Sequence, residues 1–319
     1  MARRNVIRGS IGVLLLVVAL AGQRLAGFFA QELIAEAAIL AIFALSLDLL
    51  ATCGLVSLGH AGLLGVGAYA FAGLTVLAGV APGLAFAAAV IGGAVAAFLV
   101  GLFAIRTSGA FFIMVTLACA EMFYSWVFRN RAFNGADGMG GIPRLDLSAI
   151  GVDLNDPRVF SLSAICVCVA VWLLLELVSA SPFGRTLDAI RQNPHRVVAL
   201  GGRVYLYRLA AFTASGALAA VAGALKVQHT NFLSPDLVSW FVSGDVLIAT
   251  VIGGLGTLVG GPLGAAILVF LKDALSTNLG HWYLFLGAIF AFVALAMPRG
   301  VVGFALDFAT RRERKERAP

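Results

Sequence analysis

Residues 181–208 read SPFGRTLDAIRQNPHRVVALGGRVYLYR and form the longest polar interval in the second half of the chain, with apolar runs on both sides. Ser181 suits the N-cap of a helix, and Pro182 suits its first turn because the N–H that proline lacks has no partner there. Pro194 interrupts this helix, and Gly201-Gly202 provides a stop for the segment that follows. The stretch therefore predicts a short helix between two membrane spans.

One side of this predicted helix is apolar. The apolar side chains recur at i, i+4 and i+7, which places them on one stripe; they are Phe183, Leu187 and Ile190. The charged side chains point elsewhere, and they include Arg185, Asp188 and Arg191. Two interpretations stay open at this point. The helix makes a specific contact, or the stretch is a solvated basic loop that only fixes the orientation of the chain.

The composition is that of a membrane protein. Of the 319 residues, 61% are hydrophobic and 12% are charged, against about 25% charged in an average soluble domain. A soluble protein of this length has no way to cover so much apolar surface, and the 37 glycines suit closely packed or broken membrane helices. The net charge of +6 comes from basic residues between spans and at the ends, so we interpret it as an orientation signal and not as a nucleic-acid site.

Ten apolar runs predict an all-α polytopic membrane protein with about ten transmembrane helices, because most runs have the ~20 residues that cross ~30 Å of hydrocarbon. They cover residues 11–22, 33–52, 62–80, 84–105, 111–128, 160–179, 209–229, 242–258, 262–279 and 282–297. The first run resembles a signal peptide, with Ala19-Leu20-Ala21 as a cleavage site. Since so many spans follow, we favour an uncleaved first helix.

Basic residues set the predicted orientation. With the N-terminus in the cytoplasm, about fifteen Lys and Arg residues lie on the cytoplasmic side, as the positive-inside rule requires. The chain 1–319 is then a single transmembrane domain. Its non-spanning parts are a cytoplasmic N-terminus at 1–10, an external loop at 130–159, the cytoplasmic loop at 181–208 and a cytoplasmic basic tail at 304–319. The tail is also expected to attract anionic lipid.

Two glycine-rich segments predict interrupted helices. Thr52–Ala68 reads TCGLVSLGHAGLLGVGA, and Gly253–Ala266 reads GGLGTLVGGPLGAA. Paired segments of this kind in the two halves of a chain point to the solute path of a transporter, because irregular backbone at membrane depth has to face protein or a wet cavity. The alternative is that the small residues only allow tight helix packing.

Polar side chains accompany these segments. Ser57, His60 and Tyr69 lie in or beside the first segment, and Thr257 takes the place of Ser57 in the second. Glu121 lies near the middle of a predicted span, where a charge facing lipid costs at least ~2.5 kcal/mol. We therefore expect these five side chains to line the solute path.

The sequence does not decide which groups pair with the other intramembrane charges. Lys272 lies inside a predicted span and is expected to face the protein; it pairs with Glu121 or with other polar groups. Asp48, Asp245 and Glu36 lie closer to span ends, where solvation is easier.

Five stretches, taken in order, resemble the permeases of branched-chain amino acid ATP-binding-cassette importers. They are LSLDLLATCGLVSLGHAGLLGVGAYAFAGL, GRTLDAIRQNPHRVVALGGRVYLYRLAAFTASGALAAVAGAL, FLSPDLVSW, VIGGLGTLVGGPLGAAIL and MPRGVVG. As an ordered set they cover roughly residues 33–303. The set resembles the subunit called the M-type permease, which pairs with an H-type permease.

The resemblance implies a permease subunit that moves branched-chain or related hydrophobic amino acids across the bacterial inner membrane, with both termini in the cytoplasm. Its implied partners are an H-type permease, two ATP-binding subunits and a periplasmic solute-binding protein. The chain has no GxxxxGK[ST] motif, so ATP is expected to be used by separate chains. We expect no enzymatic activity, cofactor or metal site in this chain.

Under this resemblance the helix in 181–208 transmits movement from an ATP-binding subunit. Its apolar stripe is expected to bury against the ATPase groove or against the base of the membrane domain, at roughly 1.5–3 kcal/mol for each fully buried side chain. Arg185 and Arg191 are expected to reach acceptors at the rim, where such contacts fix register. The candidate coupling residues are Phe183, Arg185, Leu187, Asp188, Ile190 and Arg191.

Departures from the family pattern leave the solute open. Asn134-Gly135-Ala136 stands where the family often has Thr-Gly-Gly, and Gly62 stands where it often has a bulkier residue. Urea, short amides and small carboxylates are the alternative solutes. A rival class is an ion-coupled secondary transporter that uses Glu121, Asp48 and Lys272. An intramembrane enzyme lacks support, since paired carboxylates, HExxH and a nucleophile–base set are missing from the sequence.

Overall fold

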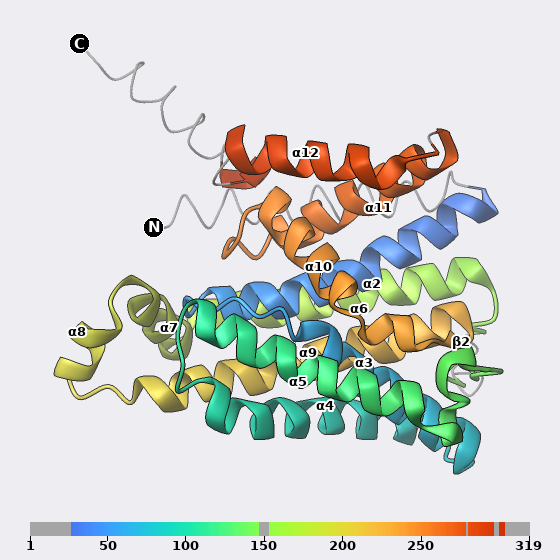
Figure 1. Ribbon diagram of the computed structural model, residues 1–319, viewed down its shortest axis with the longest axis horizontal. Helices are drawn as coiled ribbons and strands as arrows, with labels where there is room; N and C mark the ends of the chain where they lie inside the picture. The colour runs from blue at the N-terminus through green and yellow to red at the C-terminus, as the bar shows by residue number, and fades with distance from the viewer. Residues whose placement is uncertain (1–26, 147–152, 279, 297–299, 304–319) are drawn as a thin grey trace.

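A computed structural model describes residues 27–146, 153–278, 280–296 and 300–303. The predicted first span, the N-terminal segment and the basic tail lie outside these residues. The described chain is a bundle of helices, with α7 and α8 at one end and the short strands at the other (Figure 1). The α-helices are α2 (Phe28–Ala51), α3 (His60–Ala72), α4 (Pro82–Ala104), α5 (Ala110–Arg129), α6 (Pro157–Ala180), α7 (Pro182–Gln192), α8 (Pro194–Ala199), α9 (Val204–Thr230), α10 (Trp240–Gly253), α11 (Gly260–Asn278) and α12 (Trp282–Ala296).

Prolines and capping side chains begin several of these helices. Proline occupies the first turn of α4, α6, α7 and α8, where it fixes φ without losing a hydrogen bond. The side chains of Asp156, Ser181 and Asn193 accept N–H groups at the starts of α6, α7 and α8. The structure therefore confirms the predicted boundaries at Pro182 and Pro194. They could be predicted because capping and proline signals are local in the sequence.

Each predicted apolar run in the described residues is a helix, but fewer of them are long and apolar enough to cross a membrane. Six helical segments meet both criteria: Phe28–Ala51, His60–Leu77, Pro82–Ala104, Ala110–Arg129, Pro157–Ala180 and Val204–Thr230. The 14 residues of α10 are about 21 Å long at ~1.5 Å per residue, short of ~30 Å of hydrocarbon. The predicted count of about ten spans is therefore not confirmed.

Three helices form the inside of the bundle. In the 18-residue apolar stretch of each helix, about two thirds or more of α2, α3 and α9 is buried (72%, 67% and 67%). The same fraction is 22% in α4 and in α5. A chain that packs on itself in this way leaves the outer faces of α4 and α5 for lipid or another subunit. The largest apolar cluster is centred on α2 and includes Ile42, Phe43, Leu47 and Phe212.

Small residues let the inner helices approach closely. A Cβ at Gly223 of α9 would meet the backbone of Leu64, and a Cβ at Gly67 of α3 would meet the backbone of Ala220. Gly93 of α4 likewise faces Ala220 of α9. Since lipid chains are as apolar as the side chains, close backbone approach supplies much of the packing energy in membranes. The many glycines of the sequence are thus explained in part by helix packing.

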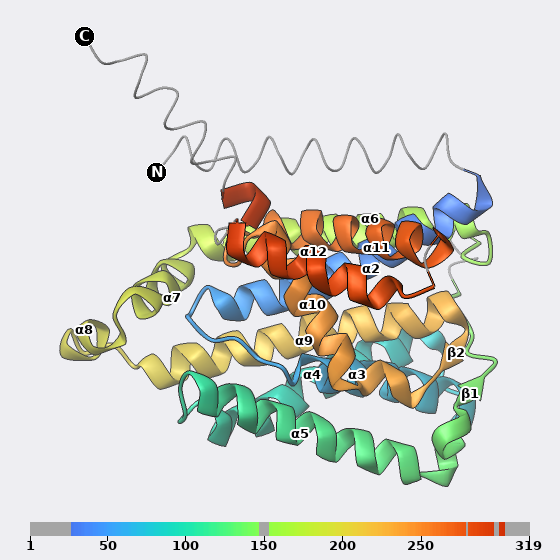
Figure 2. The same ribbon diagram turned by 45° about the horizontal axis from the view of Figure 1, so that its top comes forward.

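A short antiparallel ribbon ties two distant loops together at the end opposite α7 (Figure 2). Strand β1 (Met139–Gly140) pairs with β2 (Phe232–Leu233), with Met139 opposite Leu233. Gly138, at φ 72°, has no room for a Cβ beside the backbone of Leu233. The loop after α5 is thus ordered, over residues 130–146, against the segment that follows α9.

Candidate functional site

The first glycine-rich segment breaks the helix, as the sequence predicts. Helix α2 ends at Ala51 and α3 begins at His60, with irregular backbone between them. Gly54 has φ 78°, a conformation that favours glycine. Gly59 has no room for a Cβ because it lies against the backbone of Thr116 on α5.

His60 joins three helices at this break. Its Nε2 lies 2.7 Å from Ser215 Oγ on α9, and the Ser215 hydroxyl donates to the Ser46 carbonyl of α2 at 2.6 Å. A serine hydroxyl has one proton, so His60 Nε2 has to donate and Nδ1 carries the lone pair. His60 Nδ1 is buried and has no hydrogen-bond partner among the described residues. The ring lies between Phe43 and Phe212, with centroids 6.2 and 6.4 Å away.

Two further hydrogen bonds hold the start of α3. The Ala61 N–H donates to Ser243 Oγ of α10 at 2.9 Å. The Gly59 N–H donates to Ser57 Oγ at 3.1 Å. Ser57 and His60 are both fully buried. The first turn of α3 is therefore connected by polar contacts to α2, α9 and α10.

The second glycine-rich segment is also a break, between α10 and α11. Gly254, Gly256 and Leu258 have φ values of 114°, 75° and 59°. Thr257 Oγ1 donates to the Gly254 carbonyl at 2.7 Å and accepts the Gly260 N–H at 2.9 Å. Thr257 therefore stabilises the turn locally.

Asp48 of α2 anchors this second break. One carboxylate oxygen accepts the Gly256 N–H, and the other accepts the Leu258 N–H at 2.6 Å. The expectation that Asp48 is easily solvated is wrong, because its side chain is fully buried. Ser46 and Asp48 lie in the last turns of α2, so both breaks are fixed to the same part of one helix. The sequence gives one signal for this anchor, a carboxylate inside an apolar run.

The predicted path residue Tyr69 lies apart from this junction, whereas Glu121 follows Ala120, which faces Gly62. Tyr69 packs against Phe123 and Phe133, with ring centroids 6.1 and 5.0 Å away. It lies nine residues beyond His60, about 13 Å along the helix at ~1.5 Å per residue. Glu121 has one buried carboxylate oxygen without a hydrogen-bond partner in the described part of the chain. Lys272 pairs with Asp245 at 2.5 Å, so the alternative that it pairs with Glu121 is wrong.

The predicted helix in 181–208 forms as α7, and its apolar stripe is already covered by this chain. Leu187 and Ile190 are 1% and 0% exposed, and Phe183 stacks on Tyr207 of α9 at 5.6 Å. Leu187 and Ile190 are therefore covered by this chain itself. They pack at the end of the bundle, as the other alternative stated.

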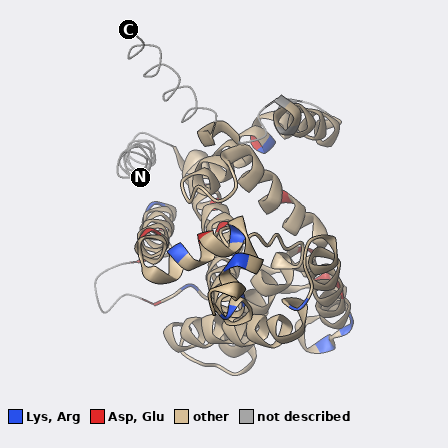
Figure 3. Cartoon of the chain, turned by 90° about the vertical axis from the view of Figure 1, so that its left-hand side faces the viewer, with Lys and Arg blue, Asp and Glu red and all other residues tan. Residues whose placement is uncertain are grey.

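Helix α7 touches the first break. A Cβ placed on Gly54 would lie 3.5 Å from the Cα and Cγ of Arg191. The Arg191 guanidinium pairs with Asp188 at 2.6 Å on the exposed face of α7, and Arg185 is also exposed. Figure 3 looks onto this end of the bundle and shows that most of the ribbon carries no charged residue. A cavity of about 500 Å³ lies beside α7 and is lined by Phe183, Gly201, Gly202, Arg203, Leu206 and Tyr207.

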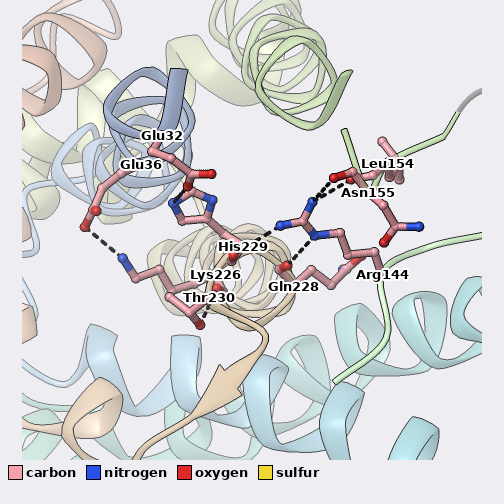
Figure 4. Close-up of polar contacts among 9 residues, drawn as sticks. All are labelled: Glu32, Glu36, Arg144, Leu154, Asn155, Lys226, Gln228, His229 and Thr230. Atoms are coloured by element: carbon pink, nitrogen blue, oxygen red, sulfur yellow. Dashed lines mark hydrogen bonds and ion pairs between the residues drawn. The ribbon is translucent and has the colours of Figure 1, made fainter. Parts of the chain in front are cut away.

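An ion pair and a histidine–carboxylate contact connect α2 with α9 toward the opposite end (Figure 4). Lys226 Nζ lies 2.7 Å from Glu36, and His229 Nε2 lies 3.3 Å from Glu32. Beside them Arg144 donates to the carbonyls of Gln228, His229, Leu154 and Asn155. Its guanidinium also lies over the ring of Phe160, 4.8 Å from the centroid. Arg144 thus fixes the end of α9 to the segment before α6.

Replacing Arg144 with methionine is expected to loosen this end of the bundle. Hydrogen bonds from a charged donor contribute about 1.5–3 kcal/mol each, and methionine keeps only the apolar stem. We expect the thermal unfolding midpoint in detergent to fall by several degrees. Arg131→Met, at an exposed position, is the control and should leave the midpoint unchanged. Equal midpoints for the two variants would contradict the assigned role of Arg144.

These features define an integral membrane protein of transport type, with two helix breaks held by one buried helix. The chain belongs to the family described as branched-chain amino acid transport system / permease component, whose model matches residues 29–294.

Individual relatives carry related names. The chain is similar to the high-affinity branched-chain amino acid transport system permease protein LivM of Salmonella typhimurium and to that of Escherichia coli K12, at 27% identity over 271 residues in each case. These alignments cover 78% of this chain and 64% of each relative, less than two thirds of their length. It is also similar to the autoinducer 2 import system permease protein LsrC of Escherichia coli O9:H4, at 27% identity over 51% of this chain and 50% of the relative. No solved structure matches the chain.

Proposed function

We propose that this chain is a membrane-spanning permease subunit of an ATP-binding-cassette importer for branched-chain or related hydrophobic amino acids. The family and the relatives named LivM support this proposal. The observation that carries it is the contact between α7 and the first helix break, through Arg191 and Gly54. A helix that lies at one end of a bundle and touches an interrupted helix is suited to transmit a push from another subunit.

The proposed partners are an H-type permease, two ATP-binding subunits and a periplasmic solute-binding protein, assembled in the bacterial inner membrane. This chain contributes no nucleotide site in the proposal. Movement of α7 reaches Gly54, then the start of α3, where His60 and Ser57 lie. The last turns of α2 carry the same movement to the second break through Asp48.

Reconstitution tests the function. We expect ATP-dependent uptake of leucine, isoleucine or valine into proteoliposomes that hold this chain, an H-type permease and the ATP-binding subunits, with the loaded binding protein outside. Omission of the ATP-binding subunits should abolish uptake. Uptake driven by an ion gradient without ATP would replace the proposal with a secondary transporter. Uptake of urea or of a small carboxylate alone would change the solute class.

A substitution on the exposed face of α7 tests coupling. Leu187→Asp is unsuitable, because Leu187 is buried within this chain and the change would disturb folding. Arg185→Glu reverses an exposed charge, and we expect it to lower transport-stimulated ATP hydrolysis at least about fivefold, equivalent to about 1 kcal/mol. Arg129→Glu, an exposed position at the end of α5, is the matched control. Normal stimulation in a correctly assembled Arg185→Glu complex would exclude this residue from the contact.

A further inference from the structure

The cavity beside α7 lies at the end of the bundle where membrane helices begin and end. It is lined by side chains and loop backbone of three segments, namely Phe183 of α7, Gly201, Gly202 and Arg203 of the loop after α8, and Leu206 and Tyr207 of α9. The spanning segment of α9 starts at Val204, and that of α6 ends at Ala180, directly before α7. Because these segments are long enough to cross the hydrocarbon, their ends mark the depth of the lipid head groups.

Arg203 is the charged side chain of this lining. It is exposed, and its guanidinium has no hydrogen bond or ion pair with the residues that the structure describes. The N–H groups of the two glycines are already used, since Gly201 donates to the Val198 carbonyl and Gly202 to the Val197 carbonyl, both at 2.9 Å. Arg203 is thus the donor that the cavity offers to a ligand, and the fork of a guanidinium matches the oxygens of a phosphate.

The surroundings of the cavity are positively charged. Residues 181–208 contain five arginines and one acidic residue, Asp188, and the Asp188 carboxylate is paired with Arg191 at 2.6 Å. Glu176, near the end of α6, is partly buried and is not part of the lining. Arg196 of α8 is exposed at the same end of the bundle. The local field therefore favours an anion.

Apolar side chains lie beside this charge. Leu206 is 48% exposed although it belongs to a spanning helix, and Leu200, directly before the glycine pair, is 88% exposed. The ring of Phe183 stacks on that of Tyr207 with 5.6 Å between the centroids. A free anion gains nothing from such surface, whereas a ligand with an acyl chain buries it. Tyrosine is also typical of the head-group depth of membrane proteins.

We propose that this cavity binds an anionic phospholipid, with the phosphate on the Arg203 guanidinium and an acyl chain along Leu206. A lipid fits better than a protein segment, because one unpaired cation lies at head-group depth next to exposed apolar side chains of a spanning helix. The arginines place this end at the cytoplasmic leaflet, which carries the anionic lipids. The bound lipid contacts both α7 and α9, through Phe183 and Tyr207. This inference goes beyond the proposed transport function and does not depend on it.

Lipid titrations of the full chain in detergent, followed by native mass spectrometry, test the site. Phosphatidylglycerol and phosphatidylcholine with the same acyl chains are the probes. We expect phosphatidylglycerol to bind at least about fivefold more tightly, because one arginine near a membrane surface contributes an attraction of this order. Arg203→Gln should remove the preference. Arg196→Gln removes the same charge from the same end of the bundle without touching the lining, so its affinity should stay within about twofold of wild type.

Equal losses in Arg203→Gln and Arg196→Gln would show unspecific attraction to basic residues and overturn the site. Arg203→Lys keeps the charge and should bind phosphatidylglycerol more tightly than Arg203→Gln does. Glycerol 3-phosphate, which has the charged group without acyl chains, should bind at least about tenfold more weakly than the lipid. Equal binding of the two would assign the cavity to free phosphate instead. Loss of the lipid preference when the chain is assembled with ATP-binding subunits would identify a protein docking surface and overturn the proposal.

Discussion

Asp48→Ala is expected to abolish uptake and to destabilise the protein. The carboxylate accepts the Gly256 and Leu258 N–H groups, and its loss leaves one partly buried and one buried donor without these bonds. Each unsatisfied buried group costs about 1–3 kcal/mol. The second break would then lose its connection to α2, so we expect a lower thermal midpoint in detergent together with loss of ATP-dependent transport.

Graded variants make this expectation specific. Asp48→Asn keeps one acceptor oxygen and should lie between wild type and Asp48→Ala in both measurements. Asp137→Ala, at an exposed carboxylate, should behave as wild type in thermal unfolding. An Asp48→Ala protein with an unchanged midpoint and normal uptake would show that the second break does not depend on this anchor.

Gly93→Leu is expected to prevent folding, whereas Gly92→Leu is expected to be tolerated. A Cβ at Gly93 would overlap the Ala220 side chain and lie 2.9 Å from the Gly216 carbonyl oxygen, while a Cβ at Gly92 meets nothing within 4 Å. The two substitutions change neighbouring residues of α4 and add the same side chain. Gly92→Leu should even favour the helix by about 1 kcal/mol, because glycine is a poor helix former.

The comparison needs only expression and gel filtration in detergent. Gly92→Leu should elute as one symmetrical peak at the wild-type position. Gly93→Leu should be degraded or aggregated, because the overlap of its Cβ with the Ala220 Cβ and the Gly216 carbonyl oxygen cannot be relieved by a rotamer change. Recovery of folded, monodisperse Gly93→Leu protein would contradict the close approach of α4 to α9.

Local patterns in the sequence account for much of the fold. The apolar runs predict each long helix of the described chain, because hydrocarbon selects for length and apolarity within one segment. Ser181, Pro182 and Pro194 set the limits of α7. They too can be recognised from the sequence, because a cap or a missing N–H group acts within one helical turn. The glycines around Gly54 and Gly254 predict the two breaks. The predicted span count is not confirmed, because an apolar run does not show how long its helix will be, and six helices of the described residues are long and apolar enough to cross a membrane.

The partners of the polar side chains were decided only by tertiary structure. His60 bonds Ser215 from 155 residues away, and Asp48 bonds Leu258 from 210 residues away; no local pattern specifies such pairs. The same holds for Lys272, whose partner is Asp245, and for the stripe of α7, which is buried by its own chain. Burial and pairing depend on which helix faces lie together in space. The sequence by itself therefore determined where helices start and break, and the packing of the bundle decided which groups meet at those breaks.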